Sequence, residues 1–196
     1  MEAPARRSDA TMRKQHTCGH RQNGVTLIEQ LMVLVIVAVL TTVAAPVLSG
    51  LLTRTRLQTA QMDFIAASQS AREMAITTGK QTLFCPTRDG ASCNADSDWE
   101  YGWLVAVDAD HDDQPDNHSP LRIGQGYAGK LAIRSSSGRH LVRFQPDGSA
   151  HGANLSILFC QPAGNEPVLS VVVSNSGRIR GGQATATQAD SCRTGL

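Results

Sequence analysis

Residues 24–48 read GVTLIEQLMVLVIVAVLTTVAAPVL, and this stretch decides the fold. Glu29 is its only charged residue, and the 18 residues from Leu31 to Leu48 carry no charge at all. As a helix those 18 residues span roughly 27 Å, which is enough to cross the apolar core of a bilayer. We therefore expect a transmembrane helix over residues 25–52 rather than a buried core helix.

The charge on either side of this stretch predicts its orientation. Residues 1–24 carry five Arg and Lys against two acids, whereas the rest of the chain carries 13 Lys and Arg against 15 Asp and Glu. Because basic flanks stay in the cytoplasm, residues 1–24 are expected there and the bulk of the chain is expected to be exported. The exported part is mildly acidic, so any nucleic-acid binding must come from a local patch.

The order of these segments differs from that of an ordinary secretory signal. In a secretory signal the cleavage site follows the apolar run, whereas here a glycine junction precedes it. A carboxylate at Glu29, at the edge of a membrane helix, is costly unless it has a partner. The stretch resembles the type III signal of type IV pilins and of the pseudopilins of type II secretion systems.

That resemblance implies how the N-terminus is processed. A prepilin peptidase would cut after Gly24, and Val25 would become the methylated N-terminal residue. Val25 departs from the phenylalanine that this family most often has there, although it is also apolar. Glu29 would pair with the N-terminal amine of a neighbouring subunit, and Pro46 would lie where many pilins have a helix-loosening proline.

Beyond Gly50 the pattern becomes amphipathic, with apolar or small residues recurring at three- and four-residue steps. We expect one helix over about 26–78, ending at Gly79, whose outer half (53–79) packs on a globular domain over 80–196. Short β-rich runs separated by turn residues follow, which predicts an α+β fold with an antiparallel sheet packed on the helix. The expected buried face comprises Leu57, Ala60, Phe64, Ala67, Ala71, Met74 and Thr78, and the expected strands are 81–85, 102–108, 121–124, 130–134, 141–145, 156–160 and 168–174.

Four of the five cysteines lie beyond the apolar run and would reach an oxidising compartment. Three pairings are possible, and we favour Cys85–Cys93 with Cys160–Cys192 because each closes a local loop. The second bridge would restrain a tail of roughly 30 residues, an effect of roughly 3–4 kcal/mol. The cysteines and histidines lack metal-ligand spacing, so neither a metal nor a cofactor is expected.

The globular part resembles the FimT/GspH family of minor pilins and pseudopilins. The resemblance rests on the order of short motifs: DWEYGWLV at 98–105, FQPDG at 144–148 and SGRIR at 176–180. It covers most of residues 24–182. It implies a non-enzymatic component of a pilus or pseudopilus, with other pilins, a prepilin peptidase and the inner membrane as partners. The C-terminal domain would be periplasmic, and extracellular when assembled.

Two arginines in the last of these motifs are candidate DNA contacts. Gly177 precedes Arg178 and Arg180, and in an extended segment an i, i+2 spacing places both guanidiniums on one side. Arginine forks suit phosphate oxygens. A Gly-Arg-x-Arg motif also resembles the DNA-contacting element of FimT-type minor pilins in natural transformation, which implies non-specific binding of double-stranded DNA. Arg134, Arg139 and Arg143, in a stretch without acids, are weaker candidates.

The residues between Asp89 and Asp116 have the opposite character, with nine acids and no Lys or Arg. Asp108, Asp110 and Asp112 alternate as at the start of a calcium loop, but Asp113 and Ser119 stand where that loop needs Gly and Glu. A solvated acidic loop is the favoured interpretation, with calcium binding as the alternative. No nucleophile frame or phosphate loop is present, so no catalysis is expected. The main functional alternative to a DNA-binding minor pilin is a structural minor pseudopilin of a type II secretion system.

Overall fold

The computed structural model describes residues 24–136, 139–162 and 164–195, so all of the expected leader except Gly24 lies outside the described residues. The chain divides into two compact units, Met1–Val43 and Ala44–Leu196. Helix α1 (Leu27–Thr78) contributes to both units, in agreement with the helix predicted over 26–78. It ends at Gly79, whose φ of 66° lies in the left-handed region that glycine adopts without strain.

In the first unit, the described part of α1 presents apolar side chains around its whole circumference. Leu27, Leu34, Val35 and Leu40 are all more than 60% exposed. Within the described residues, no helix combines the length and the apolar character that crossing a membrane requires. The transmembrane span expected over 25–52 is therefore not confirmed.

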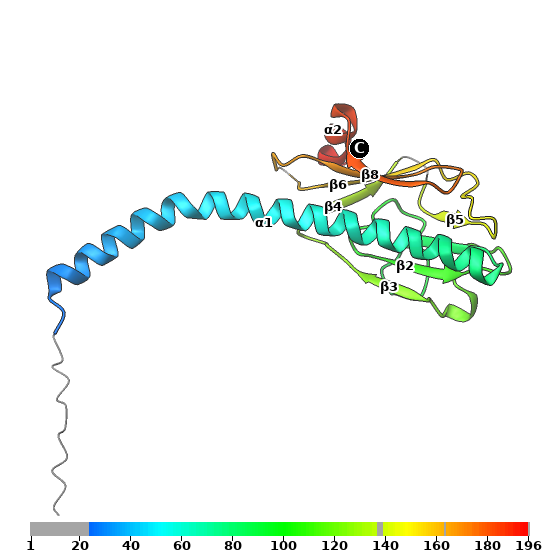
Figure 1. The fold of residues 1–196 in the computed structure, drawn as a ribbon, viewed down its shortest axis with the longest axis horizontal. Coiled ribbons are helices and arrows are strands. Elements are labelled where there is room, and N and C mark those ends of the chain that lie inside the picture. The colour runs from blue at the N-terminus through cyan, green and yellow to red at the C-terminus, as the bar shows by residue number, and fades with distance from the viewer. Residues whose placement is uncertain (1–23, 137–138, 163, 196) are drawn as a thin grey trace, which may run out of the picture. The chain divides into compact units, whose positions relative to one another are not determined.

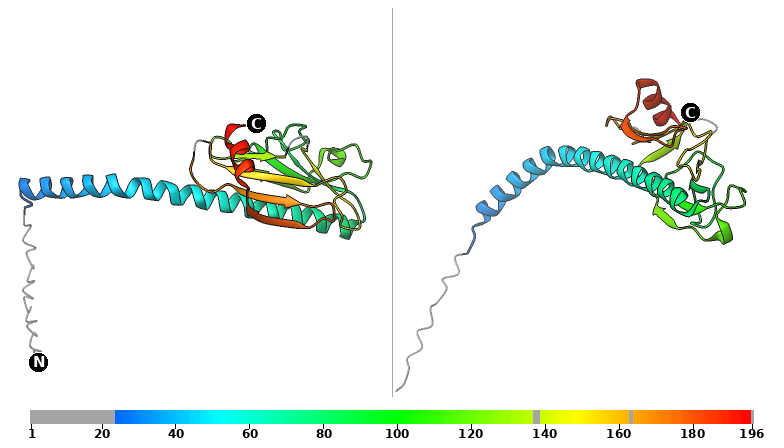
Figure 2. Two further views of the ribbon diagram at one scale, coloured as in Figure 1. Left: turned by 90° about the horizontal axis from the view of Figure 1, so that it is seen from above. Right: turned by 45° about the vertical axis from the view of Figure 1, so that its right-hand side comes forward.

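The second unit packs the remainder of α1 against antiparallel sheet, as expected, and this sheet is divided into two four-stranded sheets (Figures 1 and 2). All seven predicted strands are found within two residues of their expected bounds, and β8 is an eighth. The first sheet has the order β3-β2-β1-β5, with β1 (Thr82–Pro86), β2 (Gly102–Val107), β3 (Arg122–Gln125) and β5 (Val142–Phe144). The second has the order β4-β6-β7-β8, with β4 (Ala132–Ser135), β6 (Leu155–Cys160), β7 (Leu169–Val173) and β8 (Ile179–Gln183).

The core lies where both sheets meet one face of α1. Phe64 is fully buried, and its ring centroid lies 5.0 Å from that of Phe159 in the second sheet and 5.7 Å from that of Phe84 in the first. Edge-to-face contacts of this kind add to the free energy gained by burying the rings. The predicted buried face is correct as far as Ala71, but its last turn is wrong. Ala75 is buried there, because a step of four residues continues the stripe, whereas Thr78 is exposed.

Both disulfides favoured from the sequence are present, Cys85–Cys93 and Cys160–Cys192. The second joins β6 to a short helix, α2 (Ala186–Thr194), that the sequence analysis missed. The missed signal is a capping box: the Thr185 hydroxyl accepts from the Gln188 backbone N–H, and the Gln188 side chain accepts from the Thr185 N–H. Cys192 is buried against β4 and β6, so the C-terminal segment packs on the outer face of the second sheet.

Candidate functional site

The two arginines of the SGRIR motif lie on the β7–β8 hairpin, at the edge of the second sheet. Arg178 is in the turn and Arg180 is in β8, where it pairs with Val172. The turn is closed by a bond from the Ser174 N–H to the Arg178 carbonyl, at 3.0 Å. Arg178 and Arg180 are exposed, while Ile179 between them is partly buried and packs on the core. The predicted alternation is therefore confirmed.

Neither guanidinium has a partner in the part of the chain that the structure describes. Within the described residues, no hydrogen bond, ion pair or aromatic ring engages the side chain of Arg178 or Arg180. Among the described strands β8 pairs only with β7, so its other side is a free sheet edge. Two unpaired cations on an exposed edge have full capacity to bind an anion.

Gly177 has a structural role in the hairpin turn. It is buried and has a φ of 72°. A side chain there would overlap the Gly148 carbonyl and crowd the Nε of Arg72. The glycine therefore allows the hairpin turn to lie directly against the protein, and it fixes the backbone next to Arg178.

Two polar side chains of α1 bond the hairpin or the loop beneath its turn. Arg72 donates from Nε to the Gly148 carbonyl at 2.8 Å, beneath the hairpin turn. Gln61 donates from Nε2 to the carbonyls of Ser170 and Gly182, both at 2.9 Å, at the other end of the hairpin. Gln61 thus bonds the hairpin directly, whereas Arg72 bonds the residue against which the hairpin turn lies.

The three weaker arginine candidates have different surroundings. Arg143 in β5 makes a two-pronged ion pair with Asp113, with both N–O distances 2.5 Å, so its guanidinium is already engaged. Arg134 lies partly buried in a hollow of about 250 Å³ against α2, with its Nε buried and without a partner. Arg139 is exposed and donates to the Gly152 carbonyl. Arg139 thus lies at the end of the second sheet that carries the β7–β8 turn. Arg143 lies in the first sheet, away from that turn.

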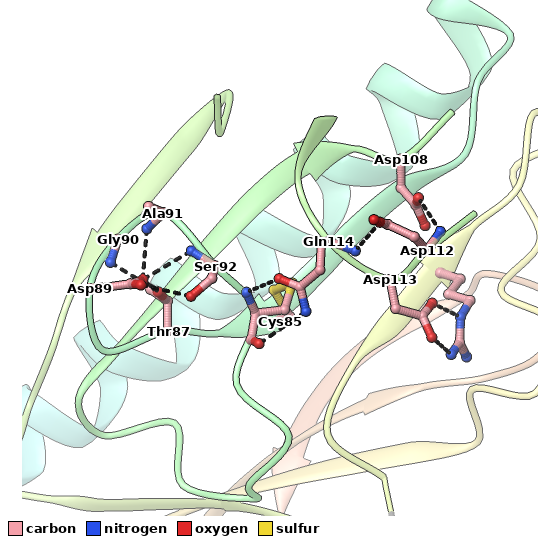
Figure 3. Close-up of a disulfide and its surroundings, with 12 residues drawn as sticks. Cys85, Thr87, Asp89, Gly90, Ala91, Ser92, Asp108, Asp112, Asp113 and Gln114 are labelled. Atoms are coloured by element: carbon pink, nitrogen blue, oxygen red, sulfur yellow. Dashed lines mark hydrogen bonds and ion pairs between the residues drawn. A yellow bond between two sulfur atoms is a disulfide. The ribbon is translucent and has the colours of Figure 1, made fainter. Parts of the chain in front are cut away.

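The acidic segment is anchored at Asp108, while Asp110 and Asp112 are exposed to solvent as the sequence interpretation expects. Asp108 is fully buried and accepts from the Gln81 side chain at 2.7 Å. It also accepts from the Asp112 N–H at 3.0 Å (Figure 3). The Gln114 side chain bonds the backbone of Cys93 with both its oxygen and its nitrogen, which ties the loop to the Cys85–Cys93 bridge.

Hydrogen bonds also shift the pKa values of two carboxylates in this region. The pKa of Asp113 lies below its ordinary value, chiefly because the Arg143 guanidinium bonds the charged form. The pKa of Asp89 is lowered more strongly, by bonds from the Ala91 N–H and from the hydroxyl and N–H of Ser92. Both carboxylates therefore stay ionised well into the acid range.

Within the described ranges, three other carboxylates form the cluster that comes nearest to a cation site. Ligand atoms of Asp108, Asp110 and Asp116 lie within 4.8 Å of one another. Asp112, the third acid of the expected calcium pattern, instead accepts from the Gln114 N–H at 2.8 Å. The fold therefore brings Asp116, and not the expected Asp112, together with Asp108 and Asp110.

At the N-terminal end of α1, Thr26 caps the helix three residues before Glu29. The Thr26 carbonyl accepts from the Gln30 N–H at 3.2 Å, and its hydroxyl lies 3.4 Å from the Glu29 nitrogen. A carboxylate in the first turn is favoured by the helix dipole. The Glu29 side chain is exposed and bonds no described residue. Gly24 and Val25 precede the helix and have no regular secondary structure.

Comparisons with known proteins place these features in a family. The family model described as type II transport protein GspH matches residues 60–177, which is more than half of the chain. The chain belongs to the GspH family. The model of the prokaryotic N-terminal methylation motif matches residues 19–45, which include Gly24, Val25 and Glu29. A comparison with curated proteins finds no match.

Solved structures agree with this fold. The crystal structure of the type IV minor pilin FimU of Pseudomonas aeruginosa strain PAO1 has a TM-score of 0.55 and 21% identity, and covers 71% of this chain and 96% of its own. A second crystal form of FimU gives 0.52 at 21% identity, with 70% and 99% covered. At this identity the likeness concerns the fold. This GspH-family chain is thus a minor pilin or pseudopilin with an N-terminal helix packed on antiparallel sheets.

Proposed function

We propose that this GspH-family chain is a minor type IV pilin that binds extracellular double-stranded DNA through Arg178 and Arg180 and supports DNA uptake in natural transformation. One observation carries the proposal: both guanidiniums are exposed on a free sheet edge and have no partner among the described residues. In contrast, Arg143, on the edge of the other sheet, is held by a carboxylate. Unpaired arginines bind phosphate oxygens without reading base sequence.

The way the hairpin is held supports the same proposal. Gln61 bonds both strands of the hairpin, and its turn rests on Gly148, which Arg72 bonds, so binding DNA would order little additional backbone. Arg139, at the same end of the second sheet, is the best placed of the weaker candidates for a further phosphate contact. Few phosphates are contacted, so affinity should be weak and dependent on salt.

The test uses the full-length mature protein in detergent micelles and a fluorescently labelled DNA duplex. We expect Arg178→Ala with Arg180→Ala to lower the affinity about tenfold at low salt, since two phosphate contacts are lost. Arg193→Ala is the matched control. Arg193 is also exposed, but it donates to the Glu166 carbonyl on α2's side of the domain. Equal DNA affinity of the wild type and the double variant would exclude the assignment.

For assembly, we propose cleavage after Gly24, methylation of Val25 and pairing of Glu29 with the N-terminal amine of a neighbouring subunit. The match to the methylation motif and the unengaged carboxylate of Glu29 support this proposal. The uncharged run after Glu29 would hold the chain in the inner membrane, single-pass with a periplasmic domain, before assembly. Glu29→Ala should remove the protein from sheared filaments, whereas Glu29→Asp should retain part of it. Mass spectrometry of the mature protein should find N-methylated Val25.

A structural minor pseudopilin of a type II secretion system is the second candidate. The family description, type II transport protein GspH, favours it specifically. A deletion strain separates the two functions: loss of transformation with normal protein secretion supports the DNA-binding pilin. Loss of secretion with normal transformation supports the pseudopilin.

A further inference from the structure

The hollow of about 250 Å³ that contains Arg134 lies on the outer face of the second sheet, between β4, β6 and α2. Arg134 of β4, Ser156 of β6 and Gln188 of α2 line it, together with the buried Leu158 and Cys192. None of the described residues that line the hollow is acidic. Its volume is smaller than the roughly 300–1,000 Å³ of pockets for drug-sized ligands, so it suits a small group.

The Arg134 guanidinium is charged, and its surroundings do not satisfy it. Its Nε is buried without a hydrogen-bond partner, and no carboxylate pairs with it in the part of the chain that the structure describes. The backbone of Asp98 bridges to that of Arg134, but the Asp98 carboxylate lies 3.9 Å from Arg88 instead. A buried donor without an acceptor is costly, and more so on a charged group. Arg134 therefore lacks an acceptor that a ligand in the hollow would supply.

Two neutral donors line the same hollow. The Gln188 side-chain oxygen accepts from the Thr185 N–H at 3.0 Å in the capping box, which orients the amide and leaves its Nε2 unbonded among the described residues. The Ser156 hydroxyl likewise makes no hydrogen bond with any described residue, since only its backbone N–H is engaged there by a side chain. One cation and two neutral donors, without an acid, suit an anion.

The hollow and the arginines of the β7–β8 hairpin share one face of the sheet. Ser156 pairs with Val172, and Val172 pairs with Arg180, so these residues form a row across β6, β7 and β8. The neighbouring Ile157 and Ile179 pack on the core, so Ser156 and Arg180 point to the outer face. Two strand spacings separate them by roughly 10 Å. A nucleic acid backbone bound at Arg180 is thus one source of an anion for the hollow, and free phosphate is the other.

We propose that the hollow binds a phosphate group, to which the Arg134 guanidinium, the Ser156 hydroxyl and the Gln188 Nε2 donate. A tetrahedral phosphate presents oxygens to β4, β6 and α2 at once, whereas the guanidinium fork alone would occupy a planar carboxylate. The Cys160–Cys192 bridge joins α2 to β6 and so keeps the Gln188 side of the hollow in place. This site does not depend on DNA binding at Arg178 and Arg180.

The test titrates the full-length mature protein in detergent micelles with inorganic phosphate, against sodium chloride at equal ionic strength, and follows thermal unfolding. We expect phosphate to raise the unfolding temperature beyond the effect of chloride, because it binds only the folded protein. Arg134→Gln should weaken phosphate binding about tenfold, since a charged donor is lost. Arg193→Gln is the matched control, because Arg193 lies on α2 outside the hollow and bonds the Glu166 carbonyl. Equal responses of the wild type and Arg134→Gln, or no response beyond that to chloride, would overturn the proposal.

Gln188→Glu separates phosphate binding from folding. Glutamate keeps the capping box, since its carboxylate still accepts from the Thr185 N–H, but it places a negative charge in the hollow with Arg134. We expect an unfolding temperature without phosphate at least as high as that of the wild type, and loss of the response to phosphate. A response of wild-type size in this variant would contradict the proposal.

A labelled DNA duplex distinguishes the two sources of phosphate. If DNA supplies the group, Gln188→Glu should lower DNA affinity about tenfold, and more than Thr187→Glu, which adds the same charge at an exposed position outside the hollow. If free phosphate is the ligand, the two variants should bind DNA alike, while only Gln188→Glu loses the response to phosphate. The Arg178→Ala, Arg180→Ala variant should keep the wild-type response to inorganic phosphate, so this proposal and DNA binding can fail separately.

Discussion

Each of the two sheets of the globular unit has an edge strand that carries arginine. The partners of these arginines differ between the two edges. On β5, Arg143 meets Asp113 in a two-pronged ion pair. On β8, Arg180 and the neighbouring Arg178 meet no carboxylate among the described residues. An arginine that is paired internally contributes to holding a loop, whereas an unpaired one on a rigid edge is free to bind a ligand. The environment of each guanidinium, rather than the number of arginines, therefore separates candidate binding residues from structural ones.

The largest expected effect comes from changing Gly177, which precedes the two unpaired arginines. Gly177→Ala should lower the free energy of unfolding by about 2–3 kcal/mol, because a left-handed residue gains a side chain that overlaps the Gly148 carbonyl. DNA affinity should fall with it, since Arg178 would be displaced. Thermal unfolding measures the first and fluorescence anisotropy the second.

Gly182→Ala is the matched control on the same strand. Its added methyl group would meet nothing nearer than the Ser170 hydroxyl, at 3.8 Å. We expect stability close to that of the wild type and unchanged DNA affinity. If both glycine variants behaved alike, the hairpin would not be held in the way described here.

Salt dependence tests the contrast between the edges directly. If Arg178 and Arg180 each neutralise a phosphate, the logarithm of the binding constant should fall with the logarithm of salt concentration with a slope near −2. The double alanine variant should lose most of that slope. Arg143→Ala on the other edge should leave the slope unchanged. A slope that changes more with Arg143→Ala than with the double variant would reverse the assignment.

The sequence predicted well what depends on local pattern. The helix bounds, the seven strand positions and the disulfide pairing follow from periodicity, turn residues and loop closure, and all are found in the structure. The exposure of Arg178 and Arg180 around Ile179 also follows from the two-residue period of extended chain. These features need no knowledge of distant contacts.

What the sequence did not predict depends on contacts between distant segments. The Gly177 conformation is fixed by Gly148 and Arg72, which are far from it along the chain. Arg143 likewise pairs with Asp113, which is 30 residues away along the chain. This contact leaves Arg143 a poor candidate for binding DNA. Helix α2 is an exception, because its capping box was readable from Thr185 and Gln188 and was missed.

Removing the engaged arginine should have a smaller effect than changing Gly177. Arg143→Ala should lower the free energy of unfolding by about 1 kcal/mol or less, because both members of the pair are more than a third exposed and solvent screens them. Hydrogen exchange should increase in the loop around Asp113 rather than across the core. A loss as large as that of Gly177→Ala would mean that the ion pair does more than hold this loop.

The smallest expected effect is the pH dependence of that same pair. The pKa of Asp113 is lowered in the folded protein, so its contribution to stability is complete above the unfolded pKa of about 4 and is lost as the pH falls through the folded value. The difference in unfolding free energy between wild type and Arg143→Ala should therefore be constant near neutral pH and shrink below about pH 4. Asp89 is common to both proteins, so its own titration cancels in the difference. Urea unfolding at a series of pH values measures this, and a difference that stays constant into the acid range would show that Arg143 acts through packing and not through Asp113.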